Sequence, residues 1–272
     1  MKRSVRRFLR GAPLIAGLPL LAACAAMPEK PPTHLPDRPE VFLDRLQAEE
    51  AAVTTARGLA NVRYEGPGGR GSATQGIVVA LPDRARLETL SPVGTAVLLL
   101  TLRGEDLRMY APTRHEYGVG PATRETLGRL ARVPVPPGPL LRLLVGLPPL
   151  AIRPGDPRVR LVVEATAIRV DSVDGRLWQR VWSTPDGMAP ERGELGEAGG
   201  LLLSYRFGDW RQLDGALFPF AVQLDERSTE TRLAIQYQTV RLNEPVEAGL
   251  FELPRPTDGT TRIIDLGAGP RP

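Results

Sequence analysis

The feature that most constrains the fold of this chain is a repeated alternation of apolar and polar residues in short segments. Leu201, Leu203 and Tyr205 share one side of such a segment, while Ser204 and Arg206 fall on the other. The same period of two recurs in segments 84–88, 220–224 and 233–237, and segments 59–64 and 74–80, which flank a Gly-rich turn, are also expected to be strands. Because successive side chains of a strand point to opposite faces, and turn residues separate the segments, this pattern predicts an antiparallel sheet or barrel.

One amphipathic helix is predicted before the first strand. The segment from Glu40 to Arg57 has no glycine or proline, and Phe42, Leu46 and Val53 recur at helical spacing. Glu49 falls on the same stripe and interrupts it. We expect a helix that begins after a proline and ends at the following glycine.

Two shorter helices are predicted in the middle of the chain. The first covers residues 123–132, and the second runs from Leu140 to Val145. Prolines precede the second helix and Gly146 follows it, which is the usual polarity of helix ends. This helix is apolar on nearly all sides, so we expect it to be buried against a concave apolar surface.

The N-terminus has the three parts of an export signal. Residues 1–10 carry five basic residues and no acid, an apolar run spans 11–21, and Ala22 and Ala23 precede Cys24. The run is shorter than the roughly 20 residues that a membrane-spanning helix needs. Cys24 is the only cysteine of the chain and lies at the cleavage position. We therefore expect a lipoprotein signal peptide over residues 1–23 and lipid on Cys24; the alternative is an ordinary signal with a chance cysteine.

Composition divides the rest of the chain into three parts. Residues 24–39 hold five prolines and predict a semi-rigid tether. Residues 40–257 are long enough for one folded domain, and residues 258–272 are expected to be a flexible tail. Five of the 35 basic residues and none of the 31 acidic ones precede Cys24, which leaves 30 against 31, about −1, after cleavage. This balance argues against a nucleic-acid partner.

No catalytic or metal-binding motif stands in a suitable context. Segment 66–71 has the spacing G-x-G-x-x-G, but a strand follows it, so a hairpin loop is expected. His34 lies in the tether, and His115 has neither a zinc-helix partner nor a nucleophile elbow. We expect a surface histidine and a protein that is not an enzyme, with no metal and no cofactor beyond the lipid on Cys24. A periplasmic hydrolase that uses His115 is a minor alternative.

The loop Ser91-Pro92-Val93-Gly94 joins the alternating segments 84–90 and 95–102. A proline followed by a glycine suits a tight turn, which the loop by itself favours. The other interpretation is a small apolar prong with Val93 at its tip.

The order of these features resembles the LolB family of outer-membrane lipoprotein receptors and its soluble relatives, the LolA carriers. The resemblance rests on Leu90-Ser91-Pro92-Val93-Gly94-Thr95, on Pro134-Val135-Pro136-Pro137, and on the helical segment that ends in Gly146-Leu147-Pro148. It covers roughly residues 40–255, and its distinctive part is 85–148. Residues 186–200 have no counterpart in the family.

The resemblance implies a mainly β (α+β) fold, a curved incomplete antiparallel β-barrel closed by short helices. Its apolar concave face would hold the acyl chains of another lipoprotein. The expected partners are these acyl chains, a LolA-like periplasmic carrier that delivers them, and the outer membrane that receives them. The lipid on Cys24 would anchor the protein to the periplasmic face of that membrane, and the absence of aspartate after Cys24 is consistent with this location.

The resemblance also assigns candidate site residues. Pro92, Val93 and Gly94 match a membrane-insertion loop in which the family carries an exposed leucine where this chain has Val93. The candidate cavity and cover residues are apolar side chains of two predicted helices: Phe42, Leu46, Val53, Leu140, Leu141 and Leu144. An alternative function is a structural or assembly lipoprotein of the envelope that uses the same fold as a scaffold, because fold does not fix function. A monomer is expected, since no long apolar stripe calls for a partner.

Overall fold

The computed structural model describes residues 37–131, 133–153 and 155–268. The predicted signal peptide (1–23), Cys24 and the tether as far as residue 36 lie outside the described residues, so these assignments stay predictions. Within the described ranges, no helix is long and apolar enough to cross a membrane.

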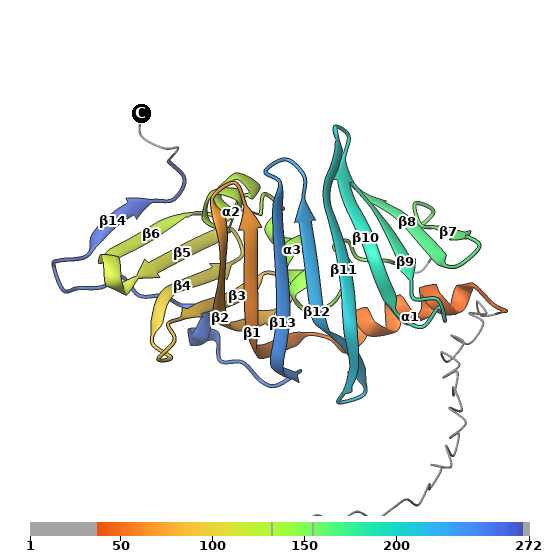
Figure 1. Cartoon of the computed structure of the whole chain (residues 1–272), viewed down its shortest axis with the longest axis horizontal. Helices are drawn as coiled ribbons and strands as arrows, with labels where there is room; N and C mark the ends of the chain where they lie inside the picture. The colour runs from red at the N-terminus through yellow and green to blue at the C-terminus, as the bar shows by residue number, and fades with distance from the viewer. Residues whose placement is uncertain (1–36, 132, 154, 269–272) are drawn as a thin grey trace, which may run out of the picture. The chain divides into compact units, whose positions relative to one another are not determined.

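The chain forms one sheet of 14 strands that curves without closing (Figure 1). Neighbouring strands follow the order β14-β6-β5-β4-β3-β2-β1-β13-β12-β11-β10-β9-β8-β7. All pairs are antiparallel except β14 with β6, which is parallel. The expected fold, a mainly β protein with a curved incomplete antiparallel barrel and short helices, is confirmed. The strands are β1 (Thr55–Gly66), β2 (Gly69–Ala80), β3 (Arg84–Leu90), β4 (Ala96–Arg103), β5 (Asp106–Ala111), β6 (Glu116–Pro121), β7 (Arg160–Val163), β8 (Ile168–Asp174), β9 (Leu177–Ser183), β10 (Pro190–Glu197), β11 (Gly200–Leu213), β12 (Ala216–Glu226), β13 (Thr231–Leu242) and β14 (Arg262–Asp265).

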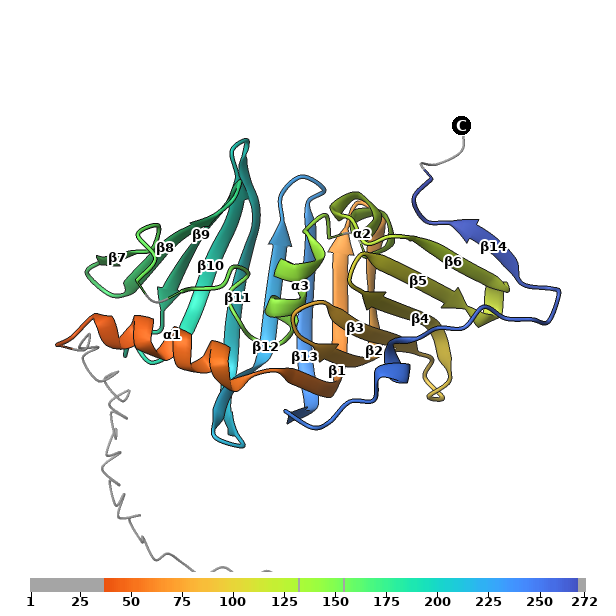
Figure 2. The same ribbon diagram turned by 180° about the vertical axis from the view of Figure 1, so that it is seen from behind.

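Strand register explains why the alternating segments form this sheet. Ile77 of β2 lies opposite Leu87 of β3, which lies opposite Leu100 of β4. Since side chains alternate along a strand, this row of apolar residues shares one face and the intervening residues point to the other. We call the face that carries the helices the inner face and the opposite one the outer face (Figure 2). Segment 66–71 forms the turn and flanks of the β1–β2 hairpin, as predicted.

Buried apolar side chains form separate clusters on the two faces. The largest cluster lies on the inner face and includes residues of the two central helices. A second inner-face cluster joins Phe42 and Leu46 to strands β8 and β9 through Ile168 and Val181. On the outer face, Phe251 of the short helix η2 (Ala248–Phe251) covers β2.

Helix α1 (Glu40–Ala52) begins where the sequence predicts but ends at Ala52, not at Arg57. Val53 has an extended backbone with φ −113° and ψ 108°, and the β-branched Thr54 that follows favours extended structure. Asn243 fixes this change of direction. Its Nδ2 donates to the Ala52 carbonyl at 2.7 Å, and its Oδ1 accepts from the Thr54 backbone N–H at 2.9 Å.

Helices α2 (Arg124–Ala131) and α3 (Pro137–Leu144) lie over the inner face (Figure 2). Pro137 suits the first turn of α3, where its missing N–H is not needed. Gly146 follows the helix with φ +79°, and a Cβ there would lie 2.3 Å from Cδ of Pro219. The predicted proline at the start and glycine after the end of this helix are therefore confirmed. The helix begins at Pro137, three residues before the expected Leu140.

Two parts of the sheet differ from the expectations. Residues 186–200, which have no counterpart in the resemblance, contain β10. Arg262–Asp265 lies in the segment expected to be a flexible tail, yet it forms β14 beside β6. Four residues are too few for a legible alternation, and the strand is held by a long-range contact: Leu266 packs over Gly118 and Gly120 of β6.

Candidate functional site: an apolar cavity on the inner face

The inner face contains a cavity of about 420 Å³ between the sheet and the two central helices. Strands β1 to β4, β12 and β13 supply one wall, while α2, α3 and the segment between them supply the other. Most lining side chains are aliphatic: Val62, Ala73, Ile77, Leu87, Leu98, Leu100, Leu130, Val133, Leu140, Leu144, Leu224, Leu233 and Ile235. The remaining lining residues are uncharged: Tyr64, Gly68, Gly71, Ser72, Gln75 and Thr89.

A small extension of about 40 Å³ adjoins this cavity. It shares Leu87, Leu100, Leu130, Leu140 and Leu144 with the larger space and continues the apolar surface toward β5. Ligand cavities in proteins commonly measure about 300–1,000 Å³ and are mainly apolar, so the combined space fits a ligand with hydrocarbon chains.

Helix α3 is held over the cavity by polar contacts at its ends. The Tyr237 hydroxyl of β13 donates to the Leu144 carbonyl at 2.6 Å. Burial raises the pKa of Tyr237, which keeps this hydroxyl protonated as a donor. Arg142 donates through Nε to the Pro148 carbonyl at 2.7 Å and pairs with Glu50 of α1 at 3.2 Å. The sheet and α1 therefore both position α3.

The segment that follows α3 is fixed in the same way. Gln179 of β9 is buried, its Oε1 accepts from the Leu150 N–H and its Nε2 donates to the Leu150 carbonyl, both at 2.9 Å. Glu50 accepts from the Ile152 N–H at 3.1 Å. These contacts satisfy buried backbone groups and connect the two inner-face clusters.

The structure brings together part of the predicted cavity set. Leu140 and Leu144 line the cavity, and Leu141 lines its extension. Phe42 and Leu46 do not line it, because α1 packs them against β8 and β9 in the second cluster. Val53 belongs to the main core but is not part of the cavity lining.

The sheet residues of the cavity were missed by the sequence analysis. Part of their signal was present in the alternation of segment 84–88, which places Leu87 on one face, whereas the apolar run 77–80 gives no face for Ile77. Alternation gives the face of each strand but not which neighbouring strands bring their faces together, so the sequence pointed only to the helices.

The loop between β3 and β4 is both a tight turn and an apolar projection. The Ser91 N–H donates to the Thr95 carbonyl at 2.8 Å, and Gly94 has φ +82°, which closes the turn. Val93 at its tip is 87% exposed, which leaves almost its whole side chain in solvent. The predicted insertion-loop residues Pro92, Val93 and Gly94 are thus exposed at one end of the sheet.

His115 lies in the turn between η1 (Pro112–Arg114) and β6. It is exposed and has a left-handed backbone with φ 48°. Its backbone carbonyl accepts from the Arg262 N–H at 2.7 Å, so its clearest role is to start the pairing of β14 with β6. Within the described residues, no group of three or more His, Cys, Asp and Glu side chains is placed to hold a metal ion.

A second, larger groove of about 860 Å³ lies on the outer face of β4, β5 and β6. Arg103, Glu105, Asp106, Arg108 and Glu252 line it. Burying hydrocarbon against several charged groups would require their desolvation, so this groove does not suit acyl chains.

Neither a comparison with protein-family models nor a search of curated proteins gives a match for this sequence. Solved structures do share the fold. A LolA superfamily protein from Nitrosomonas europaea aligns with a TM-score of 0.51 and 11% identity, over 79% of this chain and 97% of that one. A putative outer membrane lipoprotein-sorting protein domain from Vibrio parahaemolyticus gives 0.54 and 12%, over 79% and 97%. A DUF1329 family protein from Desulfovibrio piger gives 0.53 and 11%, over 82% and 97%.

The protein therefore has the LolA-like fold, in which an unclosed, curved antiparallel sheet carries short helices on one face. The LolA/LolB-like resemblance of the sequence is confirmed at the level of this fold. Within that class, the chain combines an apolar inner cavity with an exposed valine at the β3–β4 turn.

Proposed function

We propose that this protein binds the acyl chains of other lipoproteins in the inner-face cavity and passes them to the outer membrane. In this proposal it is an outer-membrane-anchored receptor that accepts its cargo from a LolA-like periplasmic carrier. The observation that carries the proposal is the uncharged, mainly aliphatic lining of the cavity. The larger outer groove lacks this property.

The energetics of burial support a transfer that needs no chemical energy. Each acyl CH₂ group removed from water contributes about 0.8 kcal/mol, so burial of several CH₂ groups in the cavity gives useful affinity. A bilayer buries the whole chain, whereas a protein cavity of about 420 Å³ buries part of it. The direction of transfer then follows from a gradient of affinity toward the membrane.

The anchor belongs to the proposal as well. Lipid on Cys24 would hold the protein at the membrane that receives the cargo. A single acyl chain gives marginal attachment, whereas two or more give a stable one. The proline-rich segment 24–39 would allow the domain to stand off the surface.

The proposal is tested by native mass spectrometry of the mature chain with Cys24→Ala, with and without a triacylated lipopeptide. A one-to-one complex is expected. Leu98→Glu, which places a charge in the cavity wall, should abolish it. Leu99→Glu is the matched control, since Leu99 is equally half-buried on the same strand but does not line the cavity.

Absence of binding by a well-folded protein would count against the proposal and favour the alternative of an envelope scaffold. In that case a pull-down should give one stoichiometric protein partner and no lipid. Equal loss of binding in the Leu98 and Leu99 variants would place the ligand elsewhere.

The β3–β4 loop gives a second prediction for this function. Val93→Glu places a charge on a side chain that is 87% exposed, so folding and lipopeptide binding should stay close to wild type. Release of bound lipopeptide into phospholipid vesicles should slow, because inserting a charged tip into a bilayer is unfavourable. Val93→Leu, which keeps the tip apolar, should release lipopeptide at least as fast as the wild type. Unchanged release with Val93→Glu would remove the loop from the transfer step.

A further inference from the structure

The cavity wall contains one polar pair among aliphatic side chains. Gln75 of β2 and Thr89 of β3 lie directly opposite each other in the sheet register. The Gln75 Nε2 donates to the Thr89 Oγ1 at 3.3 Å. Both residues are half-buried and line the cavity, where Gln75 lies between Ala73 and Ile77 of β2 and Thr89 follows Leu87 on β3.

This pair has unused hydrogen-bonding capacity. A glutamine side chain has two donor hydrogens and a carbonyl acceptor, and a threonine hydroxyl has one donor hydrogen. Within the described part of the chain, their mutual bond is the one hydrogen bond that either side chain makes. One amide hydrogen and the hydroxyl hydrogen therefore remain for a ligand atom that accepts hydrogen bonds.

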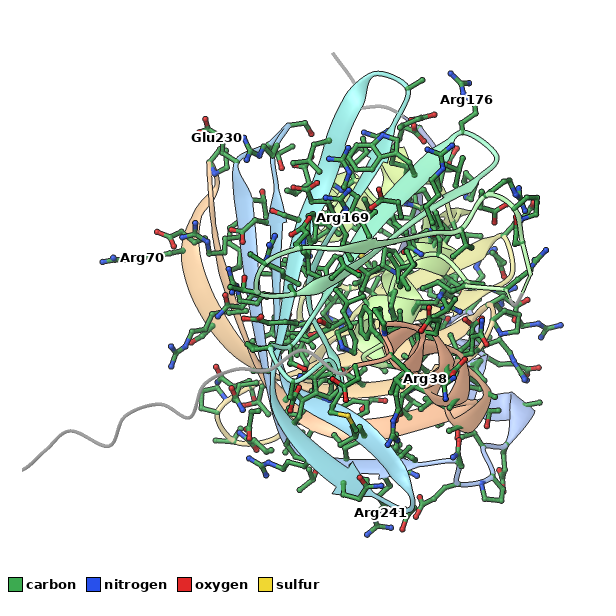
Figure 3. The ribbon with its side chains drawn as sticks, turned by 90° about the vertical axis from the view of Figure 1, so that its right-hand side faces the viewer. Arg38, Arg70, Arg169, Arg176, Glu230 and Arg241 are labelled. Carbon is green, nitrogen blue, oxygen red and sulfur yellow. The ribbon has the colours of Figure 1, made fainter. Side chains whose placement is uncertain are left out.

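The charge of the surroundings restricts what that ligand atom can be. All the described residues that line the cavity are uncharged. Arg70 and Glu230, at the tips of the β1–β2 and β12–β13 hairpins, project away from the protein in Figure 3. A carboxylate in this cavity would lose its hydration without gaining a cation, which raises its pKa and weakens its binding. A neutral carbonyl has no such penalty.

We propose that Gln75 and Thr89 bind the carbonyl oxygen of an ester or amide that adjoins an acyl chain. The cavity would then select neutral acylated ligands, such as acyl glycerides and acyl amides, over free fatty carboxylates. This inference rests on the proposed function, because it names the chemical class of ligand for the same cavity.

The test compares two ligands of equal chain length, dodecanoic acid and 1-dodecanoylglycerol, titrated into the mature chain with Cys24→Ala. At about pH 8, where the free acid is ionised in water, the glyceride should bind more tightly. The preference should be about tenfold for each unit by which burial would raise the pKa of the acid. It should shrink as the pH is lowered toward and below the ordinary pKa of the carboxylic acid, because the neutral form then becomes available for binding.

Variants of the pair test the assignment to these two residues. Gln75→Leu with Thr89→Val should weaken glyceride binding by about fivefold to a hundredfold, the range for two uncharged hydrogen bonds, and should reduce the preference for the glyceride over the acid. Thr74→Val is the matched control, since Thr74 is half-buried on β2 but does not line the cavity. Cooperative urea unfolding of each variant checks that the fold is retained.

The outcomes separate this inference from the function on which it rests. Equal affinity of the wild type for both ligands at about pH 8 would overturn the selectivity while upholding acyl binding. An unchanged preference in the double variant would remove Gln75 and Thr89 from recognition. Failure of both ligands to bind would overturn the proposed function and the inference together.

Discussion

At the scale of single residues, Glu49 shows that a charge on an apolar stripe can have a structural purpose. In the sequence it interrupts the predicted amphipathic helix. In the structure its Oε2 accepts a hydrogen bond from the Leu217 N–H at 3.1 Å, which ties α1 to the start of β12. Burial raises the pKa of Glu49, opposed by this hydrogen bond and by the nearby Arg45.

The raised pKa of Glu49 predicts a pH dependence of stability. Between its ordinary and its raised pKa, Glu49 holds a proton in the folded state that it has lost in the unfolded state. The free energy of unfolding should therefore fall as pH rises through this window. Glu49→Gln keeps an acceptor for Leu217 and cannot ionise, so it should remove this fall and be at least as stable as wild type at neutral pH.

Urea unfolding at several pH values measures this effect. Glu49→Ala removes the acceptor and should lower the free energy of unfolding by about 0.5–1.5 kcal/mol, the usual contribution of one hydrogen bond, since the Leu217 N–H is part-buried. Asp44→Asn, at an exposed position of the same helix, is the control and should leave the pH dependence unchanged. If Glu49→Gln loses as much stability as Glu49→Ala, the hydrogen bond needs the charge and this account of Glu49 is wrong.

At the scale of elements, the position of α3 depends on the sharp turn at its C-terminus. Gly146 combines a left-handed φ of +79° with a 2.3 Å approach of a hypothetical Cβ to Pro219. Gly146→Ala should therefore lower the free energy of unfolding by at least about 2 kcal/mol, from left-handed strain and overpacking. It should also weaken acyl binding, because α3 carries Leu140 and Leu144 into the cavity wall.

Gly76→Ala is the matched substitution for this prediction. Gly76 lies in β2, and a Cβ there would meet only the Cβ of Glu88 at 3.7 Å, which is ordinary contact. This change should be neutral or stabilise the fold by about 0.5–1 kcal/mol, the usual cost of glycine in a strand. Similar unfolding midpoints for both variants would show that the turn does not hold α3.

The elements also show which parts of the fold the sequence reveals. Strands β3, β11, β12 and β13 appear in the sequence because each has an apolar inner face and a more polar outer face. Strands β1 and β2 appear because they flank a Gly-rich turn. Strands of the β7–β10 region are harder to recognise, since Gly193 and Gly196 replace side chains where Tyr205 and Trp178 pack closely. The length of α1 was overestimated because the pairing of β1 with β2 and β13 competes for residues 55–57.

For the site, local sequence patterns predicted the helical wall of the cavity better than the wall formed by the sheet. The apolar α3 and its Leu140 and Leu144 were recognisable from a short sequence between proline and glycine. Phe42 and Leu46 were expected to line the cavity but pack against β8 and β9 instead. Helical spacing shows that a face is buried but not what it packs against. The Gln75–Thr89 pair depends on the register of β2 against β3, which neither segment encodes by itself.

At the scale of the whole molecule, the C-terminal segment returns to cover the far edge of the sheet. β14 pairs with β6, and Leu266 fills the space over Gly118 and Gly120. β14 thereby replaces β6 as the edge strand, and since it is only four residues long, it offers a shorter edge to other chains.

Leu266→Ala should therefore lower the free energy of unfolding by about 2–4 kcal/mol, as expected for a buried leucine. It should also speed hydrogen exchange of the β6 amides, because β14 would detach. Ile263→Ala changes a residue of β14 that is 41% exposed, and should alter stability by less than about 0.5 kcal/mol. Normal protection of β6 in Leu266→Ala would show that β14 does not depend on this contact.

The central claim is that acyl chains lie in the inner-face cavity, and photocrosslinking tests it most directly. A lipopeptide with a diazirine at the end of one acyl chain is bound to the mature chain and irradiated, and the modified residues are mapped by mass spectrometry. We predict that crosslinks concentrate on the cavity lining of β3, β4 and α3, at residues such as Leu87, Leu98 and Leu140. Crosslinks confined to the charged outer groove around Arg103 and Arg108 would contradict the account.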